Sequence, residues 1–395
     1  MDRKFASVII MILIAISLIL EPVTAEKPLW IAAGGSPVEI SNNGDYVLCD
    51  GEIFYLYNSK GEKQWGGYGS GYDFPAPSKI TKDGNYFILG TDSGIVYLDR
   101  SMKLYWKDSD FHPIQDIALS PDENYIAAVA ESEVSLYTSE GQLLWRKYNP
   151  GSKSVAVSSN GLMTVASGGR GTIAYNQSGF QLWTSAGSGD NLVITIPDSN
   201  IITTSQYTLY FLHPSGLYLW KSLTSNIIRD FSSTPDGSYI VVGNEAGNIY
   251  LFNKSGNVLW KYNAGDWINS VSISPDGSII AAGGNNKKLY VFNRDGRLLW
   301  DYATEGLVKS VVISADGSSL VAGSDRIYYF SLQPIQSSSL ATPEITPTRT
   351  QAVETITLPS TTGPMETPTQ KSGLRFSVLI ALGISFVWII LRREK

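Results

Sequence analysis

The side chains that most often carry catalysis or bind metals are few in this sequence and stand far apart. Its 395 residues include only two histidines, His112 and His213, and one cysteine, Cys49. Two separate histidines supply neither a histidine metal site nor a histidine-dependent hydrolytic triad. We predict that His112 lies in a connection between repeats, His213 in a hairpin turn, and Cys49 among buried apolar residues. The sequence therefore assigns no catalytic residue, no metal ligand and no cofactor.

The charged residues indicate neither a nucleic-acid partner nor a defined acid–base pair. The chain has 30 Lys and Arg against 36 Asp and Glu, a net charge of −6, whereas nucleic-acid-binding proteins usually carry a basic surface. The acidic residues are scattered, which leaves a carboxylate pair possible without pointing to one. No Gly-x-Ser-x-Gly nucleophile motif occurs. This composition favours binding over catalysis.

Two markers recur along the chain with a period of about 40 residues, which is typical of repeat folds. The first is a tight turn of the Pro-Asp-Gly type, at Asn43-Gly44, Asp83-Gly84, Asp122-Glu123, Asn160-Gly161, Asp198-Ser199, Asp236-Gly237, Asp276-Gly277 and Asp316-Gly317. The second is a tryptophan, at Trp30, Trp65, Trp106, Trp145, Trp183, Trp220, Trp260 and Trp300. One tryptophan per repeat at fixed register predicts a packing role rather than a ligand-binding array.

Each repeat has the pattern of four short strands. In the seventh unit, 270–273 alternates polar and apolar residues, and Asp276-Gly277 follows as a hairpin turn. The apolar run 279–282 is typical of a strand buried on both faces. Two further strands are expected at 289–292 and 298–300. Four antiparallel strands in about 40 residues form one blade of a β-propeller.

The ends of the repeat region predict how the ring closes. The first unit begins with its fourth strand, around Leu29-Trp30, and the last unit stops after its third strand, at 326–330. The N-terminal strand can complete the last blade, which removes open sheet edges that favour aggregation. We therefore predict an all-β, eight-bladed propeller over residues 28–333.

The region 28–333 resembles two groups of propellers. The turn Ser274-Pro275-Asp276-Gly277 resembles that of WD-repeat propellers, although no Gly-His dipeptide occurs and Trp300-Asp301 is the only Trp-Asp pair. The segment 253–260, Asn-Lys-Ser-Gly-Asn-Val-Leu-Trp, is similar to the repeat of pyrroloquinoline-quinone (PQQ)-type propellers. That resemblance implies eight blades with tryptophans packed between them. Fold resemblance does not fix function.

The PQQ resemblance also raises an enzyme hypothesis. Quinone-dependent dehydrogenases of this kind add insertions, a calcium site and usually two adjacent cysteines over the cofactor. This chain has almost no insertions between repeats, and its single Cys49 excludes the pair. A PQQ-like propeller enzyme, redox or hydrolytic, remains the alternative function.

Both ends of the chain carry membrane-related signals. Residues 1–25 have Arg3 and Lys4, an apolar run and a Val-Thr-Ala ending, which predicts a cleaved signal peptide, with an uncleaved anchor as the alternative. Residues 334–372 include ten Thr, six Pro and five Ser, which predicts a stalk. Residues 374–391 are apolar and precede the basic tail 392–395, which predicts a transmembrane anchor with a cytoplasmic end. The tail is similar to those of archaeal surface proteins, so we expect an extracellular propeller anchored by a single span.

Two groups of residues are candidates for binding. The first lies seven residues before the turn marker, where each innermost strand begins, and comprises Gln115, Lys153, Asn191, Arg229, Asn269 and Lys309. These side chains are expected at the mouth of the central channel, where their cations could attract an anion or acidic glycan. A merely solvated entrance is the alternative.

The second group consists of aromatic residues in the connections that lead to the same face. Its members are Tyr68, Tyr72, Phe74, Phe111 and Trp267. We expect the glycine-rich segment 66–72 to be a flexible recognition loop, although these aromatics could instead cap hydrophobic edges between blades. The sequence thus predicts a monomeric, non-catalytic cell-surface propeller that binds or scaffolds a protein or glycan partner.

Overall fold

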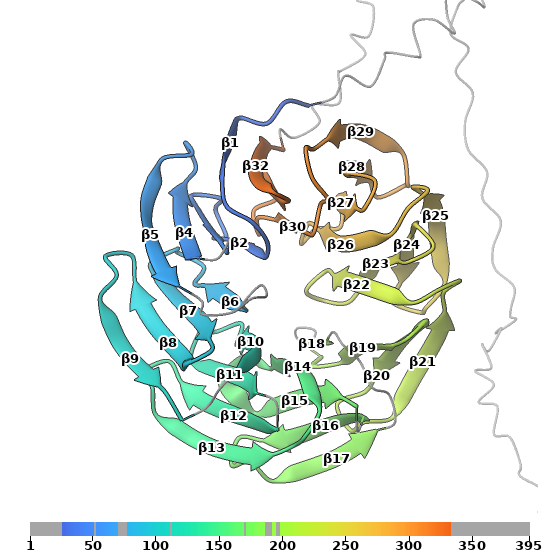
Figure 1. The fold of residues 1–395 in the computed structure, drawn as a ribbon. Helices are drawn as coiled ribbons and strands as arrows, with labels where there is room; N and C mark the ends of the chain where they lie inside the picture. Colours follow the sequence, from blue (N-terminus) through green and yellow to red (C-terminus); the bar gives the residue numbers. More distant parts are fainter. Residues whose placement is uncertain are drawn as a thin grey trace, which may run out of the picture. The chain divides into compact units, whose positions relative to one another are not determined.

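A computed structural model of the chain contains eight four-stranded sheets arranged around a common centre, as Figure 1 shows. The described residues belong to one compact unit. They are 26–50, 53–69, 77–110, 113–130, 132–169, 171–185, 192–194 and 198–332. The predicted eight-bladed propeller is therefore confirmed.

Within each complete blade the strands follow chain order from the centre outwards and pair antiparallel. Blades 1 and 2 contain β2 (Val38–Ile40), β3 (Tyr46–Cys49), β4 (Ile53–Asn58), β5 (Lys63–Gly69), β6 (Ser78–Ile80), β7 (Tyr86–Thr91), β8 (Gly94–Asp99) and β9 (Leu104–Asp108). Blades 3 and 4 contain β10 (Ile114–Leu119), β11 (Tyr125–Ala130), β12 (Glu133–Thr138), β13 (Leu143–Tyr148), β14 (Ser152–Val157), the short 3-10 turn η1 (Ser159–Gly161), β15 (Met163–Gly168), β16 (Gly171–Asn176) and β17 (Gln181–Ser185).

The second half of the ring repeats this arrangement. Blades 5 and 6 contain β18 (Leu192–Ile194), β19 (Ile201–Ser205), β20 (Thr208–Leu212), β21 (Tyr218–Leu223), β22 (Ile228–Ser233), β23 (Tyr239–Asn244), β24 (Asn248–Asn253) and β25 (Val258–Asn263). Blades 7 and 8 contain β26 (Ile268–Ile273), β27 (Ile279–Gly284), β28 (Lys288–Asn293), β29 (Leu298–Ala303), β30 (Ser310–Ile313), β31 (Ser319–Gly323), β32 (Arg326–Ser331) and β1 (Trp30–Ala33).

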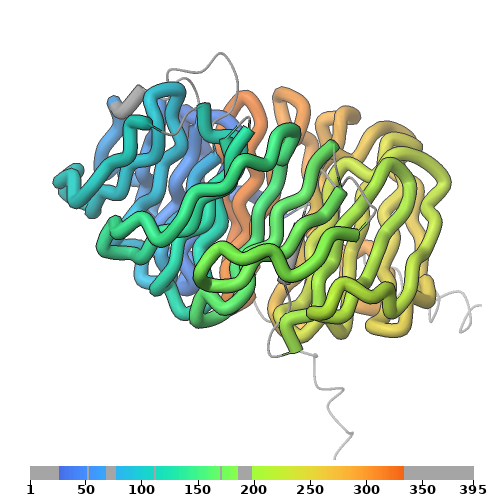
Figure 2. The backbone as a smooth tube through the Cα atoms, turned by 90° about the horizontal axis from the view of Figure 1, so that it is seen from below, coloured from blue at the N-terminus to red at the C-terminus, as the bar shows by residue number. Residues whose placement is uncertain are grey.

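The ring has two faces, between which the strands run (Figure 2). We call the face where the innermost strands begin the entry face, and the face where they end the exit face. The marker turns and the turns between third and fourth strands lie on the exit face. The connections between blades lie on the entry face.

The N-terminal strand closes the last blade, as the sequence predicts. Strand β1 pairs antiparallel with β32, and Trp30 lies opposite Tyr329. The sheet order β1-β32-β31-β30 makes this strand the outermost member of blade 8. Every strand of the ring therefore finds its partners within residues 30–331.

The hydrophobic core lies between neighbouring sheets rather than at the centre of the ring. The second strand of a blade is buried on both faces, and in β11 every residue from Ile126 to Ala130 is buried. One cluster of buried residues combines Ile88 of blade 2 with Ile117 and Tyr137 of blade 3. Burial of apolar side chains between consecutive sheets is what holds the blades together.

The repeated tryptophans join one blade to the next on the exit side. An indole N–H donates to a backbone carbonyl in the next blade's turn between third and fourth strands for Trp30, Trp106, Trp145, Trp183, Trp220 and Trp260. Each ring covers a glycine of that turn, and a Cβ added there would lie 2.4–2.7 Å from the indole, at Gly61, Gly141, Gly179, Gly216, Gly256 and Gly296. The turn glycine is thus required both by its positive φ and by the close approach of the indole.

Trp65 departs from this pattern. The glycine position of the turn it faces is occupied by Met102, which has a φ of 67°. The Nε1 atom of Trp65 is buried and has no hydrogen-bond partner among the described residues. The ring instead packs edge-on against Phe87 at 5.5 Å. The side chain of Met102 explains the difference, because its Cβ occupies the place into which the other indoles fit.

Several sequence predictions concern segments outside the described residues. These are the signal peptide 1–25, the stalk 334–372, the transmembrane anchor 374–391 and the basic tail 392–395. Within the described residues no helix is long and apolar enough to cross a membrane. The segment 66–72 was expected to be a loop, but residues 66–69 continue strand β5, so that expectation was wrong for its first half.

Candidate binding site on the entry face

A β-bulge marks the start of four innermost strands, at the positions that the sequence singled out. The bulged residues are Gln115, Lys153, Arg229 and Asn269. In β10, Ile114 pairs with Ala130 and Asp116 pairs with Val129, which leaves Gln115 without an opposite residue. A bulge turns the extra residue away from the regular alternation of the strand, and the side chains of Gln115, Lys153 and Arg229 are exposed.

The two remaining predicted residues of this group differ in what the structure shows. The backbone N–H of Lys309 donates to Gly323 at 2.9 Å, and the side chain is exposed. Its ammonium group has no ion-pair partner within the described part of the chain. Asn191 lies outside the described residues.

Asn269 joins two blades. Its side-chain amide donates to Oδ1 of Asn285 at 2.8 Å and to the carbonyl of Val308 in blade 8 at 3.0 Å. The side chain is partly buried, in contrast to the other bulged residues. Its donors are therefore used within the ring, and it contributes to the rigidity of the site more than to contact with a partner.

Arg229 and Trp267, which the sequence placed in two separate groups, contact each other. The guanidinium of Arg229 lies over the Trp267 ring, 5.4 Å from its centroid, and its Nη1 is 3.5 Å from Oε1 of Glu245. Trp267 remains 41% exposed. A guanidinium held by an aromatic face on one side and a carboxylate on the other is oriented before any partner arrives.

Trp267, which the sequence singled out, has two exposed apolar counterparts, Ile227 and Leu307, that the sequence reasoning missed. Ile227, Trp267 and Leu307 stand at intervals of 40 residues, and their exposed fractions are 44%, 41% and 39%. Each precedes a bulge-position residue by two, and the residue between them is buried. We call Ile227, Arg229, Trp267, Asn269, Leu307 and Lys309 the entry arc. In the sequence these three residues share one feature: each lies nine positions before a marker turn. That spacing does not reveal whether the side chain is exposed.

The other predicted aromatic residues do not extend this arc in the described structure. Tyr68 lies in β5, where its backbone pairs with Phe54, and nothing is described of its side chain. Tyr72, Phe74 and Phe111 lie outside the described residues.

Hydrogen bonds between neighbouring innermost strands make the wall of the ring rigid. Asp116 accepts from Ser154 Oγ at 3.0 Å and from the Val155 N–H at 2.9 Å. Asp230 likewise accepts from the Val271 N–H at 2.9 Å. In later blades a serine hydroxyl takes the place of the carboxylate as acceptor: the Val311 N–H donates to Ser270 Oγ, and the Val38 N–H donates to Ser310 Oγ. These side chains position the strands from which the entry arc begins.

The two buried acids of this wall differ in their charge environment. Lys79 forms an ion pair with Glu39, and Lys79 also lowers the pKa of Asp116, although burial is the larger effect and leaves that pKa raised. Burial raises the pKa of Asp230 to about 6, against the lowering effect of hydrogen bonds from Val271, Ser270 and Phe231. The repeat position that holds Lys79 in blade 2 is Ile194 in blade 5.

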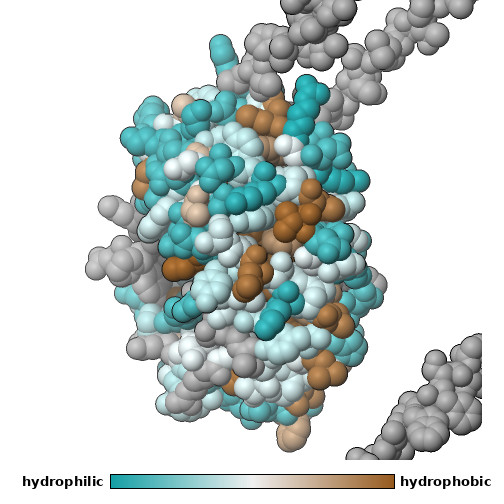
Figure 3. Space-filling model, turned by 90° about the vertical axis from the view of Figure 1, so that its right-hand side faces the viewer, coloured by the Kyte–Doolittle hydropathy of each residue, from teal (hydrophilic) through white to brown (hydrophobic). Residues whose placement is uncertain are grey.

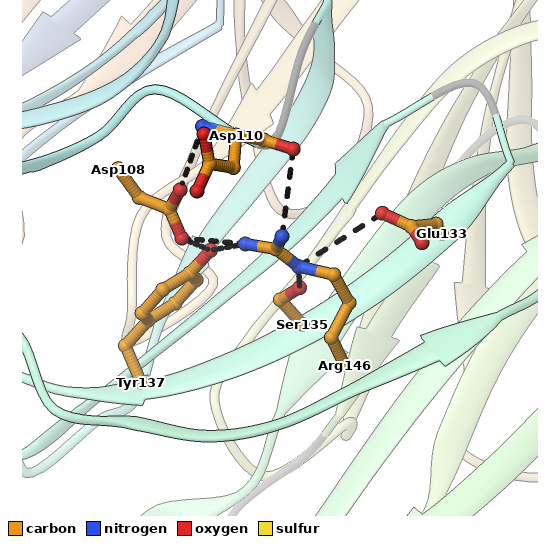
Figure 4. Close-up of polar contacts among 6 residues, drawn as sticks. All are labelled: Asp108, Asp110, Glu133, Ser135, Tyr137 and Arg146. Carbon is orange, nitrogen blue, oxygen red and sulfur yellow. Dashed lines mark hydrogen bonds and ion pairs between the residues drawn. The ribbon is translucent and has the colours of Figure 1, made fainter.

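A second polar cluster joins blades 2 and 3, as Figure 4 shows. Arg146 Nη2 donates to Oδ2 of Asp108 at 2.5 Å and to the Tyr137 hydroxyl at 3.2 Å, while Nε donates to Ser135 at 3.1 Å. The Tyr137 hydroxyl donates to the same Asp108 oxygen at 2.9 Å, and burial raises the pKa of Tyr137. The donors and acceptors satisfy one another, so this cluster acts as a link between blades.

The cysteine and the histidine that the structure describes do not form a reactive site. Cys49 is fully buried, and burial raises the pKa of its thiol to about 12, which suppresses the reactive thiolate. His213 is exposed in a hairpin turn, where Nδ1 lies 2.8 Å from Ser215 Oγ. His112 lies outside the described residues. Among the residues that the structure describes, no group of three or more His, Cys, Asp or Glu could hold a metal ion.

Comparisons with known proteins agree with the fold. A family model described as "Outer membrane protein assembly factor BamB" matches residues 130–273, and one described as "WD domain, G-beta repeat" matches residues 256–293. No curated protein sequence matches the chain.

Many solved structures share the ring. The C-terminal WD40 domain of Sif2 is 15% identical over 78% of this chain and 99% of that chain, with a TM-score of 0.68. Sqt1 from Saccharomyces cerevisiae is 15% identical over 78% and 100%, with a TM-score of 0.65. Chaetomium thermophilum Sqt1, bound to the N-terminus of the ribosomal protein L10, is 14% identical over 78% and 100%, with a TM-score of 0.64. At these identities the likeness establishes a WD-like and PQQ-like β-propeller fold.

Proposed function

We propose that this chain is a non-catalytic binding or scaffolding propeller that recognises a protein partner at the cell surface. The entry arc is the observation that carries the proposal. Three consecutive blades present an exposed apolar side chain, Ile227, Trp267 or Leu307, beside a polar or cationic one. Apolar contacts bordered by hydrogen-bonding and charged groups are typical of protein interfaces.

The chemistry of the arc suits a protein segment that has both apolar and acidic side chains. Trp267 offers a large apolar face, and tryptophan is among the residues that contribute most to interface energy. Lys309 supplies a cation without an ion-pair partner in the described structure. The hydrogen bonds of Asn269 to Asn285 and Val308 join blades 7 and 8, which carry Trp267 and Lys309. A partner would therefore meet a preorganised surface.

The comparisons support this proposal by analogy. Sqt1 has a similar ring and is bound to the N-terminus of a ribosomal protein, so a propeller of this shape can hold a protein segment. The partial match to an outer-membrane assembly factor supports the scaffolding form of the proposal. Residues 1–25 and 334–395 support a surface location, because they have the patterns of a signal peptide, a stalk, a single transmembrane span and a basic tail.

The test compares capture of envelope proteins by the purified ring, residues 26–332, and by two variants. The arc variant carries Ile227→Ser, Trp267→Ala and Leu307→Ser. The control variant carries Leu29→Ser, Ile31→Ser and Leu104→Ser; these residues are also exposed, at 65%, 41% and 45%, but lie on or directly before outermost strands.

We expect the arc variant to lose a partner that the wild type and the control variant both retain. A Lys153→Ala, Arg229→Ala, Lys309→Ala variant should bind that partner more weakly, with less dependence on salt. Equal capture by the arc variant and the wild type would refute the site.

The alternative of a PQQ-like propeller enzyme rests on the family match over 130–273 and on Asp230, whose raised pKa is a property of many catalytic acids. Asp230 already accepts a hydrogen bond between blades, as Asp116 does, and this is sufficient to explain its presence. Bound calcium together with a quinone absorption spectrum in the purified protein would favour the enzyme.

A further inference from the structure

One sector of the ring is poor in acidic residues. Residues 141–229 contain six Lys and Arg but only two acidic residues, Asp190 and Asp198, whereas the whole chain has a net charge of −6. This sector extends from the last strand of blade 3, through blades 4 and 5, to the beginning of blade 6. Charge is therefore distributed unevenly around the ring.

The same sector carries most of the exposed large apolar side chains of the described structure. Eleven of the 19 lie between residues 141 and 229, and they are Leu143, Tyr148, Leu162, Phe180, Leu182, Tyr207, Leu217, Tyr218, Leu219, Leu223 and Ile227. Most stand on or beside the outermost strands. Figure 3 shows apolar side chains gathered in several clusters on the rim that β21 and β25 form. Exposed apolar groups at this density usually mark a contact surface.

The outermost strands of this part of the ring carry cations without acids. Strands β13, β17, β21 and β25 contain no acidic residue, and their cations are Arg146, Lys147, Lys221 and Lys261. Strands β1 and β5 also lack acidic residues, but between them they have a single cation, Lys63, and β9 and β29 contain Asp108 and Asp301. The rim of blades 3 to 6 thus combines apolar and cationic side chains.

A notch in this rim gives the surface a specific site. A cavity of about 590 Å³ lies between β13 and the turn before β17, and its lining includes Lys147, Tyr148 and Phe180. Tyr148 and Phe180 are 73% and 71% exposed. The Lys147 ammonium forms no ion pair with any described residue. A cation without an ion-pair partner in the described structure, which lines the same cavity as two exposed aromatic side chains, suits an anionic head group at an apolar boundary.

We propose that this rim, centred on the notch of Lys147, Tyr148 and Phe180, docks on the surface of an anionic lipid bilayer. Lys147 pairs with a lipid phosphate, and Tyr148 and Phe180 enter the region between head groups and acyl chains. The exposed apolar side chains are spread along the outside of the ring in several separate clusters, which suits a soft, adaptable surface better than one complementary protein pocket. The three notch residues do not belong to the entry arc, so the test of this proposal is separate from the test of the arc.

Co-sedimentation with vesicles tests the proposal. The protein used is the ring 26–332, because every strand of the ring pairs with strands inside this segment. We expect the ring to bind phosphatidylcholine vesicles containing about one third phosphatidylserine, and to bind more weakly as salt rises. Pure phosphatidylcholine vesicles should retain much less protein. A Lys147→Glu, Tyr148→Ser, Phe180→Ser variant should bind the anionic vesicles with an affinity at least about tenfold lower than that of the wild type.

The matched control is the triple variant Leu104→Ser, Tyr105→Ser, Lys107→Glu on β9, which makes similar changes at exposed positions of another rim. It should bind like the wild type, and circular dichroism should show that both variants are folded. Inorganic phosphate at millimolar concentration should not release the protein if a lipid surface is the ligand. Equal binding to both kinds of vesicle, equal loss in both variants, or binding only to an acidic protein would each overturn the proposal.

Discussion

The turn that contains Met102 offers the sharpest test of how tryptophans join the blades. Six tryptophans donate to the next blade's turn over a glycine, whereas Trp65 faces Met102 and its indole N–H has no partner. Replacing Met102 by glycine removes the obstructing Cβ. We expect Trp65 then to dock on the turn and donate to a carbonyl there, as Trp106 does to Ser139 at 2.9 Å.

The expected gain follows from three effects. Relief of the left-handed backbone at Met102, where φ is 67°, contributes about 1 kcal/mol. A satisfied indole N–H contributes about another 1 kcal/mol. The greater freedom of glycine in the unfolded chain costs roughly 0.5–1 kcal/mol. The net effect is an increase of about 1 kcal/mol in the free energy of unfolding.

Urea unfolding of the ring 26–332, followed by tryptophan fluorescence, measures this change. Met102→Ala is the control, because it keeps a Cβ and the unfavourable φ and should bring no gain. If Met102→Gly leaves stability unchanged or lowers it, the glycine contact does not determine tryptophan docking. A gain of equal size in Met102→Ala would refute the steric explanation.

Three further predictions concern side chains in the junctions and on the entry face. Trp220→Phe should lower the free energy of unfolding by about 1 kcal/mol more than Trp65→Phe, because only Trp220 loses a hydrogen bond; equal losses in urea unfolding would contradict this. Burial raises the pKa of Asp230 to about 6 in the folded state, so the contribution of this carboxyl to stability is greatest below pH 4 and is lost as pH rises through about 6; relative to wild type, Asp230→Asn should lack this loss, up to about 3 kcal/mol, in unfolding measured across this range. Arg229→Ala and Trp267→Ala should show a coupling of about 1 kcal/mol in partner affinity, since the two side chains stack, and strict additivity in a double-mutant cycle would argue against a shared surface.

The eight blades could be predicted because the repeat fixes two different contacts in each unit. The marker turn needs a residue that tolerates positive φ, such as Gly237 or Gly277, and the tryptophan needs a glycine in the following blade. Each requirement restricts the residue type at one position of the repeat, so the same residue types recur in the sequence about every 40 residues. The closing strand could be predicted for a related reason, since a three-stranded last unit and a single first strand complete one sheet.

The binding surface was harder to predict, because exposure depends on the whole ring. Ile227 and Leu307 resemble ordinary strand-start apolar residues in sequence, and only the structure shows that they are exposed, as Trp267 is. Asn269 looked like its neighbours in the series, but its amide group is used to join blades. The notch at Lys147 is formed by side chains of two neighbouring blades that lie about 30 residues apart in the sequence. Neither segment carries a motif from which the notch could be predicted.

The closure of blade 8 has a mechanical consequence. Strand β32 lies between β31 and β1 and pairs antiparallel with both, so the chain leaves the ring at Leu332 from a strand held on two sides. If a partner grips the entry face while tension acts at Leu332, the force runs along β32, and the hydrogen bonds on both its sides lie across the force and carry it together. Such loading resists rupture better than peeling one strand from an edge. Because the entry arc lies on blades 6 to 8 and β32 belongs to blade 8, the force passes through these three blades, and blades 1 to 5 lie outside its path.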